Sequence, residues 1–138
     1  MHPDPASEAG RWIAQSERDL DDARFNASGD RHHLACFLSQ QAGEKALTGV
    51  LYLGGEERVL GHSCAELARA LGDRGPALVE LFGPAAALDK YYIPTRYPNG
   101  LPGGIPSEAF SAEDSALAIG HAERIVHACR AVLARGSD

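Results

Sequence analysis

The stretch HHLACFLSQQAGEKALTGVLYL, residues 32–53, reads as one long helix that is apolar on almost every side. At 100° per residue, two apolar stripes result: Leu34, Ala35, Leu38, Ala42, Ala46, Val50 and Leu53 on one, and Phe37, Leu47 and Leu51 on the other. A helix with this pattern must be surrounded by other helices. We therefore expect it to form the centre of the fold.

Three long polar side chains interrupt this apolar helix. Gln41 and Lys45 fall within the first stripe, and Glu44 falls within the second. A buried lysine or glutamate is costly unless it is paired. These side chains therefore either reach the rim of the bundle or pair with one another, or they mark a partner surface or a polar site at its centre.

Length and charge limit the classes of protein. A chain of 138 residues is long enough for one core and too short for two, so we expect a single domain over residues 1–138. Its 44% hydrophobic and 23% charged residues are typical of a globular protein. The formal net charge of −6 argues against non-specific coating of nucleic acid, which requires a basic field. A small local phosphate site is compatible with this charge.

The cysteines and the N-terminal residues predict a compartment. Cys36, Cys64 and Cys129 are an odd number of thiols, and the beginning of the chain, MHPDPASEAG, is polar and unlike a signal peptide. No apolar run approaches the length that spans a bilayer. We therefore expect a reduced, cytoplasmic protein that does not enter the membrane.

Capping residues and apolar spacing predict the other helices. The five predicted helices begin at Asp4–Ser7, His32, Ser63, Gly75 and Ser111, and they end near Ala27, Leu53 and Gly72, before Pro94 and before Gly136. Pro84 removes a backbone donor, which predicts a kink or break near Gly83. The predicted fold class is all-α: an up-and-down bundle of about five helices with a long Pro/Gly-rich loop before the last.

That loop and its approach hold the densest polar and aromatic segment. Residues 88–104 read LDKYYIPTRYPNGLPGG, and they place Tyr91, Tyr92 and Tyr97 close to Arg96. An arginine beside aromatic rings is suited to bind a phosphate and a base. Alternatively, the tyrosines attach a proline-stiffened loop to the bundle while Arg96 caps carbonyls or pairs with an acid.

Two weaker patterns concern metals and bases. His32 and Cys36 share a helix face and His62 lies close to Cys64, a set that could hold zinc only if the two segments meet. Buried thiols and surface imidazoles explain the same residues, so we predict neither a metal nor another cofactor.

On the last predicted helix, Glu123 and His127 are spaced so that the carboxylate could orient the imidazole as a general base. An exposed ion-pair face explains the same residues more simply, and it is the interpretation that we favour.

Several segments together resemble a known family. The segments QQAGEKA at 40–46, GHS at 61–63 and YIPTRYP at 92–98 are similar to those of the prokaryotic HEPN domain family, and the likeness covers nearly the whole chain. The resemblance implies an up-and-down helical bundle, commonly dimeric and often encoded beside a minimal nucleotidyltransferase as a toxin–antitoxin-like pair. Many members are metal-independent ribonucleases.

The ribonuclease signature of that family is an arginine followed, after four to six residues, by a histidine. In this chain Leu101, Pro102 and Gly103 stand where a histidine would follow Arg96, and His62 follows Arg58 one residue too early. We therefore expect a dimeric nucleotide- or RNA-associated binding module that partners a nucleotidyltransferase. The alternative is a divergent metal-independent ribonuclease. The candidate residues are Lys45, Tyr92, Arg96 and Tyr97 for ligand binding, Gln41 and Glu44 for the partner surface, and Arg58, His62 and Arg96 for catalysis.

Overall fold

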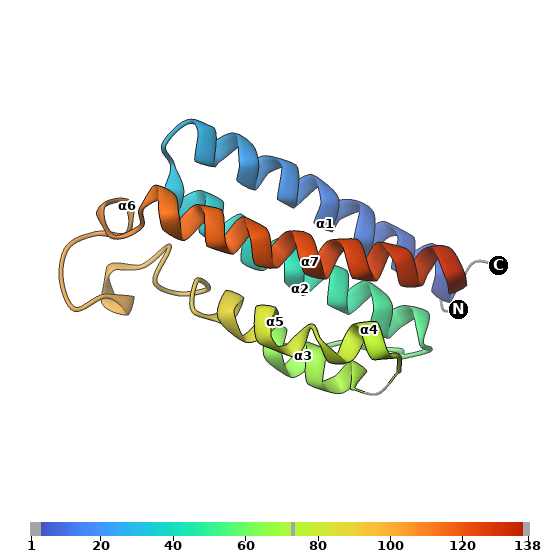
Figure 1. Cartoon of the computed structure of the whole chain (residues 1–138). Coiled ribbons are helices and arrows are strands. Elements are labelled where there is room, and N and C mark those ends of the chain that lie inside the picture. Colours follow the sequence, from blue (N-terminus) through green and yellow to red (C-terminus); the bar gives the residue numbers. More distant parts are fainter. Residues whose placement is uncertain (1–3, 73, 137–138) are drawn as a thin grey trace.

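The computed structural model describes residues 4–72 and 74–136, and its regular structure is entirely helical within those residues (Figure 1). The elements are α1 (Pro5–Ser28), α2 (His32–Leu53), α3 (Cys64–Leu71), α4 (Pro76–Val79), α5 (Phe82–Asp89), a 3-10 turn (Pro98–Gly100), α6 (Pro106–Ala109) and α7 (Ala112–Gly136). The all-α bundle that the sequence predicts is confirmed.

The apolar helix α2 lies at the centre of the bundle. It contacts α1, α3, α5, α6 and α7, and Ala35, Ala42, Ala46 and Leu47 on its surface are completely buried. Figure 1 shows the long helices α1, α2 and α7 side by side, with α3, α4 and α5 next to α2 and α7 on the side away from α1. A helix apolar on almost every side is thus covered from almost every side.

Glycines allow the neighbours of α2 to approach closely. A Cβ atom on Gly49 would lie 2.9 Å from Ile13 Cγ1 and 3.1 Å from the backbone oxygen of Ala9. A Cβ atom on Gly43 would lie 2.7 Å from Leu88 Cδ1. Glycine in the interior of a helix is about 1 kcal/mol less favourable than alanine. Close packing of the neighbouring side chains and backbone explains why glycine stands at these two positions.

Polar groups fix the predicted helix ends. Asp4 accepts a hydrogen bond from the Ser7 amide of α1 at 3.0 Å, and Ser63 Oγ accepts one from the Glu66 amide of α3 at 3.1 Å. The Asp89 carboxylate, at the end of α5, also accepts hydrogen bonds at the start of α3. These come from Ser63 Oγ at 2.6 Å, the Cys64 amide at 2.6 Å and the Ala65 amide at 3.2 Å.

The fourth predicted helix is interrupted, as Pro84 indicates. The regular structure stops after Val79 and resumes at Phe82, slightly before the predicted break at Gly83. Pro84 consequently falls in the first turn of α5, where a missing amide proton breaks no intrahelical hydrogen bond.

The segment 93–110 is attached to the bundle. Thr95 is buried and its hydroxyl donates to the Tyr91 carbonyl, while the Tyr91 and Phe110 rings meet edge to face with centroids 6.1 Å apart. The loop therefore holds Arg96 and its neighbours in defined positions. None of the helices in the described residues has the length and hydrophobicity needed to cross a bilayer.

Candidate functional site

Tyr92 is the centre of a group of side chains from three parts of the chain. We call Phe37, His62, Tyr92, Arg96 and Tyr97 the arginine–aromatic cluster. The Arg96 guanidinium carbon lies 4.6 Å from the ring centroids of both Phe37 and Tyr92, and 5.1 Å from that of Tyr97. The predicted ligand residues Tyr92, Arg96 and Tyr97 therefore lie together, joined by Phe37 of α2.

Arg96 carries a charge that no acidic side chain of the described residues neutralises. Its Nε donates to the Tyr92 carbonyl at 2.9 Å. Within residues 4–72 and 74–136, none of the ion pairs involves Arg96. Arg96 thus caps a carbonyl, as one alternative predicted, but in this part of the chain it does not pair with an acid. Its cation and its terminal nitrogens are suited to bind an anion.

His62 joins this cluster from the linker between α2 and α3. Its ring stacks on that of Tyr92, with centroids 5.2 Å apart and an interplanar angle of 17°. His62 and Arg96 therefore contact the same ring, that of Tyr92. Sequence spacing paired His62 with Arg58, which lies exposed in the linker.

Glu44 faces His62 from inside the bundle. Its Oε1 lies 2.7 Å from His62 Nδ1, and the residue is only 8% exposed. Burial raises the pKa of Glu44, an effect that the adjacent His62 opposes. The partner-surface role of Glu44 stays a prediction, and in this structure its carboxylate is directed at the cluster.

Lys45 lies in a different environment from Arg96. Its Nζ lies 2.5 Å from Asp19 Oδ2 of α1, and it donates to Gln41 Oε1 at 3.3 Å. Gln41 in turn donates to the side-chain oxygen of Gln40 at 2.7 Å. The ion pair offsets the cost of a half-buried lysine, and the ligand-binding role of Lys45 and the partner role of Gln41 stay predictions.

The zinc alternative requires ligands that the fold does not assemble. Among the described residues, no group of three or more His, Cys, Asp or Glu side chains is arranged to hold a metal ion. Nδ1 of His32 instead lies 2.9 Å from Ser115 Oγ. The three thiols are buried, and burial raises the pKa of each above its ordinary value.

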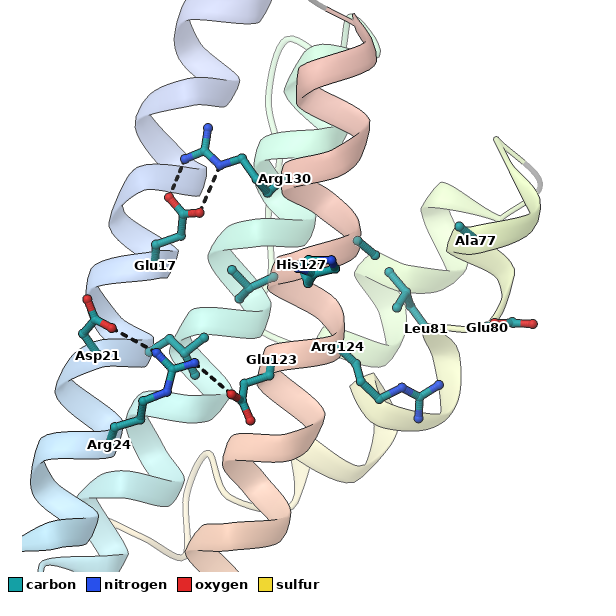
Figure 2. Close-up of a pocket in the computed structure, with 13 residues that line it drawn as sticks. Glu17, Asp21, Arg24, Ala77, Glu80, Leu81, Glu123, Arg124, His127 and Arg130 are labelled. Carbon is teal, nitrogen blue, oxygen red and sulfur yellow. Dashed lines mark hydrogen bonds and ion pairs between the residues drawn. The ribbon is translucent and has the colours of Figure 1, made fainter.

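A groove of about 710 Å³ lies along α7, between α1 and the α4–α5 region (Figure 2). Its walls carry ion pairs: Arg24 contacts Asp21 at 3.0 Å and Glu123 at 2.8 Å. Arg130 binds Glu17 through two nitrogens, as Figure 2 shows. Glu123 is thus engaged by Arg24, which favours the ion-pair interpretation of the Glu123 and His127 spacing.

The groove and the cluster differ in their electrostatics. In the groove most arginine charge is matched by carboxylates, whereas in the cluster the charge of Arg96 faces aromatic rings. An uncompensated cation among rings has more capacity to bind a ligand than a neutralised surface has. We therefore take the cluster, rather than the groove, as the candidate site.

Comparison with known proteins identifies the family to which this fold belongs. The sequence model of the HEPN domain matches residues 9–132. Among solved structures, the chain is similar to TT1696 from Thermus thermophilus, with 31% identity over 90% of this chain and 97% of that one, and a TM-score of 0.84. It is also similar to ST0689, described as an archaeal HEPN homologue, with 38% identity over 91% and 98% of the two chains and a TM-score of 0.76.

A third similar structure is a HEPN domain protein from Thermotoga maritima, with 29% identity over 91% of this chain and 98% of that chain and a TM-score of 0.71. No curated protein matches the chain. The chain belongs to the HEPN domain family, which confirms the resemblance seen in its sequence.

Proposed function

We propose that this chain is a HEPN binding module that takes the phosphate of a nucleotide or of an RNA end at Arg96. The observation that carries the proposal is the guanidinium of Arg96, surrounded by three aromatic rings and without an acidic partner in the described part of the chain. Phosphate recognition uses such a cation, and a base can stack on an exposed ring. Tyr97, half of whose surface is exposed, is the ring available for stacking.

Substitutions at Arg96 test the proposal directly. Adenosine 5′-monophosphate and a short single-stranded oligoribonucleotide serve as probes in calorimetric titrations. Arg96→Ala should weaken binding at least about tenfold, since a charge-assisted contact is worth roughly 1.5–3 kcal/mol. Arg96→Lys, which keeps the charge and loses the planar fork, should fall between.

Arg124→Ala is the matched control, because Arg124 is an exposed arginine of α7 at the groove rather than at the cluster. It should leave binding unchanged. Equal affinity in wild type and Arg96→Ala, or equal losses in Arg96→Ala and Arg124→Ala, would refute the proposal. If Arg96→Ala lowers only stability, the cluster attaches the loop and has no ligand role.

The proposal includes two interactions with other chains. The module forms a homodimer, and it partners a minimal nucleotidyltransferase in a toxin–antitoxin-like pair in the cytoplasm. Membership of the family supports both, and exposed apolar residues, including Ile93 in the segment of Arg96 and Leu34 on α2, offer contact surface. Light scattering tests the dimer, and co-purification with the product of the adjacent gene tests the partner.

One observation favours a divergent ribonuclease as the second candidate. His62, bonded to Glu44, lies against the same ring as Arg96, so a potential base and a cation share one cluster. Incubating RNA with the protein in the presence of a chelator decides between the two functions. Cleavage that requires both Arg96 and His62 supports the enzyme, whereas cleavage unaffected by Arg96→Ala and His62→Ala does not involve these residues.

A further inference from the structure

His62 is held more firmly than an exposed histidine requires. About two thirds of its side-chain surface is exposed (65%), yet its ring contacts Glu44 and Tyr92 and its backbone carbonyl accepts from Gln40 Nε2 at 3.0 Å. The next residue, Ser63, is bound by Asp89. Both the backbone and the ring of His62 are therefore fixed.

Two of these contacts come from buried polar side chains of α2, whose removal from water costs free energy. Gln40 is completely buried and Glu44 nearly so, on a helix whose surroundings are otherwise apolar. A well-packed apolar side chain would stabilise such positions at least as well as a buried carboxylate. What the carboxylate supplies, and an apolar group does not, is an acceptor directed at one nitrogen of His62.

The direction of that hydrogen bond determines the state of the imidazole. An ionised carboxylate can only accept, so Nδ1 of a neutral His62 carries the proton and donates it to Glu44. The other nitrogen, Nε2, then has a free lone pair. Because Nδ1 faces the protein interior, Nε2 lies on the exposed side of the ring.

We propose that Glu44 is a positioning residue that fixes His62 in the Nδ1–H tautomer, so that Nε2 is a hydrogen-bond acceptor on a ring stacked against Tyr92, the ring that Arg96 also contacts. Gln40 supports this role by holding the His62 backbone. An acceptor and a cation in one cluster can together recognise a ligand that carries both an anionic phosphate and a hydroxyl donor. The inference takes its ligand from the proposed function, but the positioning role stands on the protein alone.

The primary test needs no ligand. The ring nitrogens of His62, recorded by nitrogen–proton NMR at about pH 8, where an ordinary imidazole is neutral, report the tautomer. Wild type should show Nδ1–H. Glu44→Ala should revert to the Nε2–H form that free imidazole favours in water. Glu44→Gln should show a mixture of the two forms, because its amide can accept from Nδ1–H or donate to an unprotonated Nδ1.

A second measurement connects the tautomer to binding. Glu44→Ala should weaken the binding of adenosine 5′-monophosphate about five- to tenfold, the value of one hydrogen bond, and Glu44→Gln should restore part of that loss, in proportion to its Nδ1–H population. Circular dichroism confirms that each variant is folded. A purely structural role would alter stability in both variants without separating their tautomers.

The outcomes distinguish the two proposals. An Nε2–H tautomer in wild type, or an unchanged tautomer in Glu44→Ala, overturns the positioning role whatever the nucleotide does. Failure of wild type to bind the nucleotide overturns the proposed function, while the NMR result still decides the role of Glu44.

Discussion

Replacing Gly49 with alanine should destabilise the protein, although alanine is the better helix former. Gly49 lies in α2 where α1 crosses closely, and the added methyl carbon would lie 2.9 Å from Ile13 Cγ1 and 3.1 Å from the Ala9 backbone oxygen. The side chain of Trp12 is also close, at 3.2 Å. Since one of these atoms belongs to the backbone, a rotamer change alone cannot remove the overlap.

The magnitude follows from two opposing contributions. Alanine gains about 1 kcal/mol over glycine in a helix interior. An extra methyl group in a well-packed core costs about 1–3 kcal/mol, and contact with a helix backbone favours the upper part of that range because α1 itself must shift. The expected net effect is a loss of about 1–2 kcal/mol in the free energy of unfolding.

The matched control is Gly120→Ala in α7, where no atom lies within 4 Å of the added methyl group. That variant should be more stable by about 0.5–1 kcal/mol. Urea unfolding followed by circular dichroism measures both. Opposite signs for one chemical change support the close approach of α1 and α2, and equal or greater stability of Gly49→Ala would refute it.

Three further perturbations have expected outcomes. Because burial raises the pKa of Glu44, the folded state binds that proton more tightly than the unfolded state, so the associated stability is lost as pH rises through the folded pKa. The stability of Glu44→Gln relative to wild type should therefore increase from about pH 4 to about pH 7 in urea unfolding, and a decrease would contradict this. Burial raises the pKa of both Cys36 and Cys129 to about 12, so iodoacetamide should modify neither thiol in the native protein and both in urea, as mass spectrometry can check. Asp89→Ala removes three acceptor contacts at the start of α3 and should reduce the free energy of unfolding by about 1–3 kcal/mol, with a smaller loss in Asp89→Asn, which keeps one acceptor oxygen.

The sequence predicts the helices well because their signals are local. The bounds of α2 match the prediction at both ends, and Ser63 caps α3 as its spacing indicated. Apolar spacing and capping groups act within a few residues, so they can be read without knowledge of the fold. The break before α5 follows in the same way from Pro84.

The candidate site is only partly local. Tyr92, Arg96 and Tyr97 are neighbours in the chain, so their proximity could be predicted. The stacking of His62 on Tyr92 depends on how the linker passes over α2, and no sequence spacing encodes that path. The pairing of Lys45 with Asp19 likewise required the register of α1 against α2.

The groove depends on register between distant helices. Its ion pairs join residues separated by 99 and 113 positions, Arg24 with Glu123 and Arg130 with Glu17. On α7 alone, Glu123 and His127 suggested two interpretations, and the choice between them required the position of α1. Tertiary contacts of this kind arise from packing of whole helices rather than from any local pattern.

The carboxylate of Asp89 links the two chain segments that meet at Tyr92. Ser63, which it binds, directly follows His62, and Tyr92 comes a few residues after Asp89 itself. A change at Asp89 can therefore separate the imidazole from the tyrosine ring while α1, α2 and α7 stay folded. Loss of ligand affinity in such a variant would indicate that the His62 and Tyr92 rings are misaligned, and it would not identify Asp89 as a ligand contact.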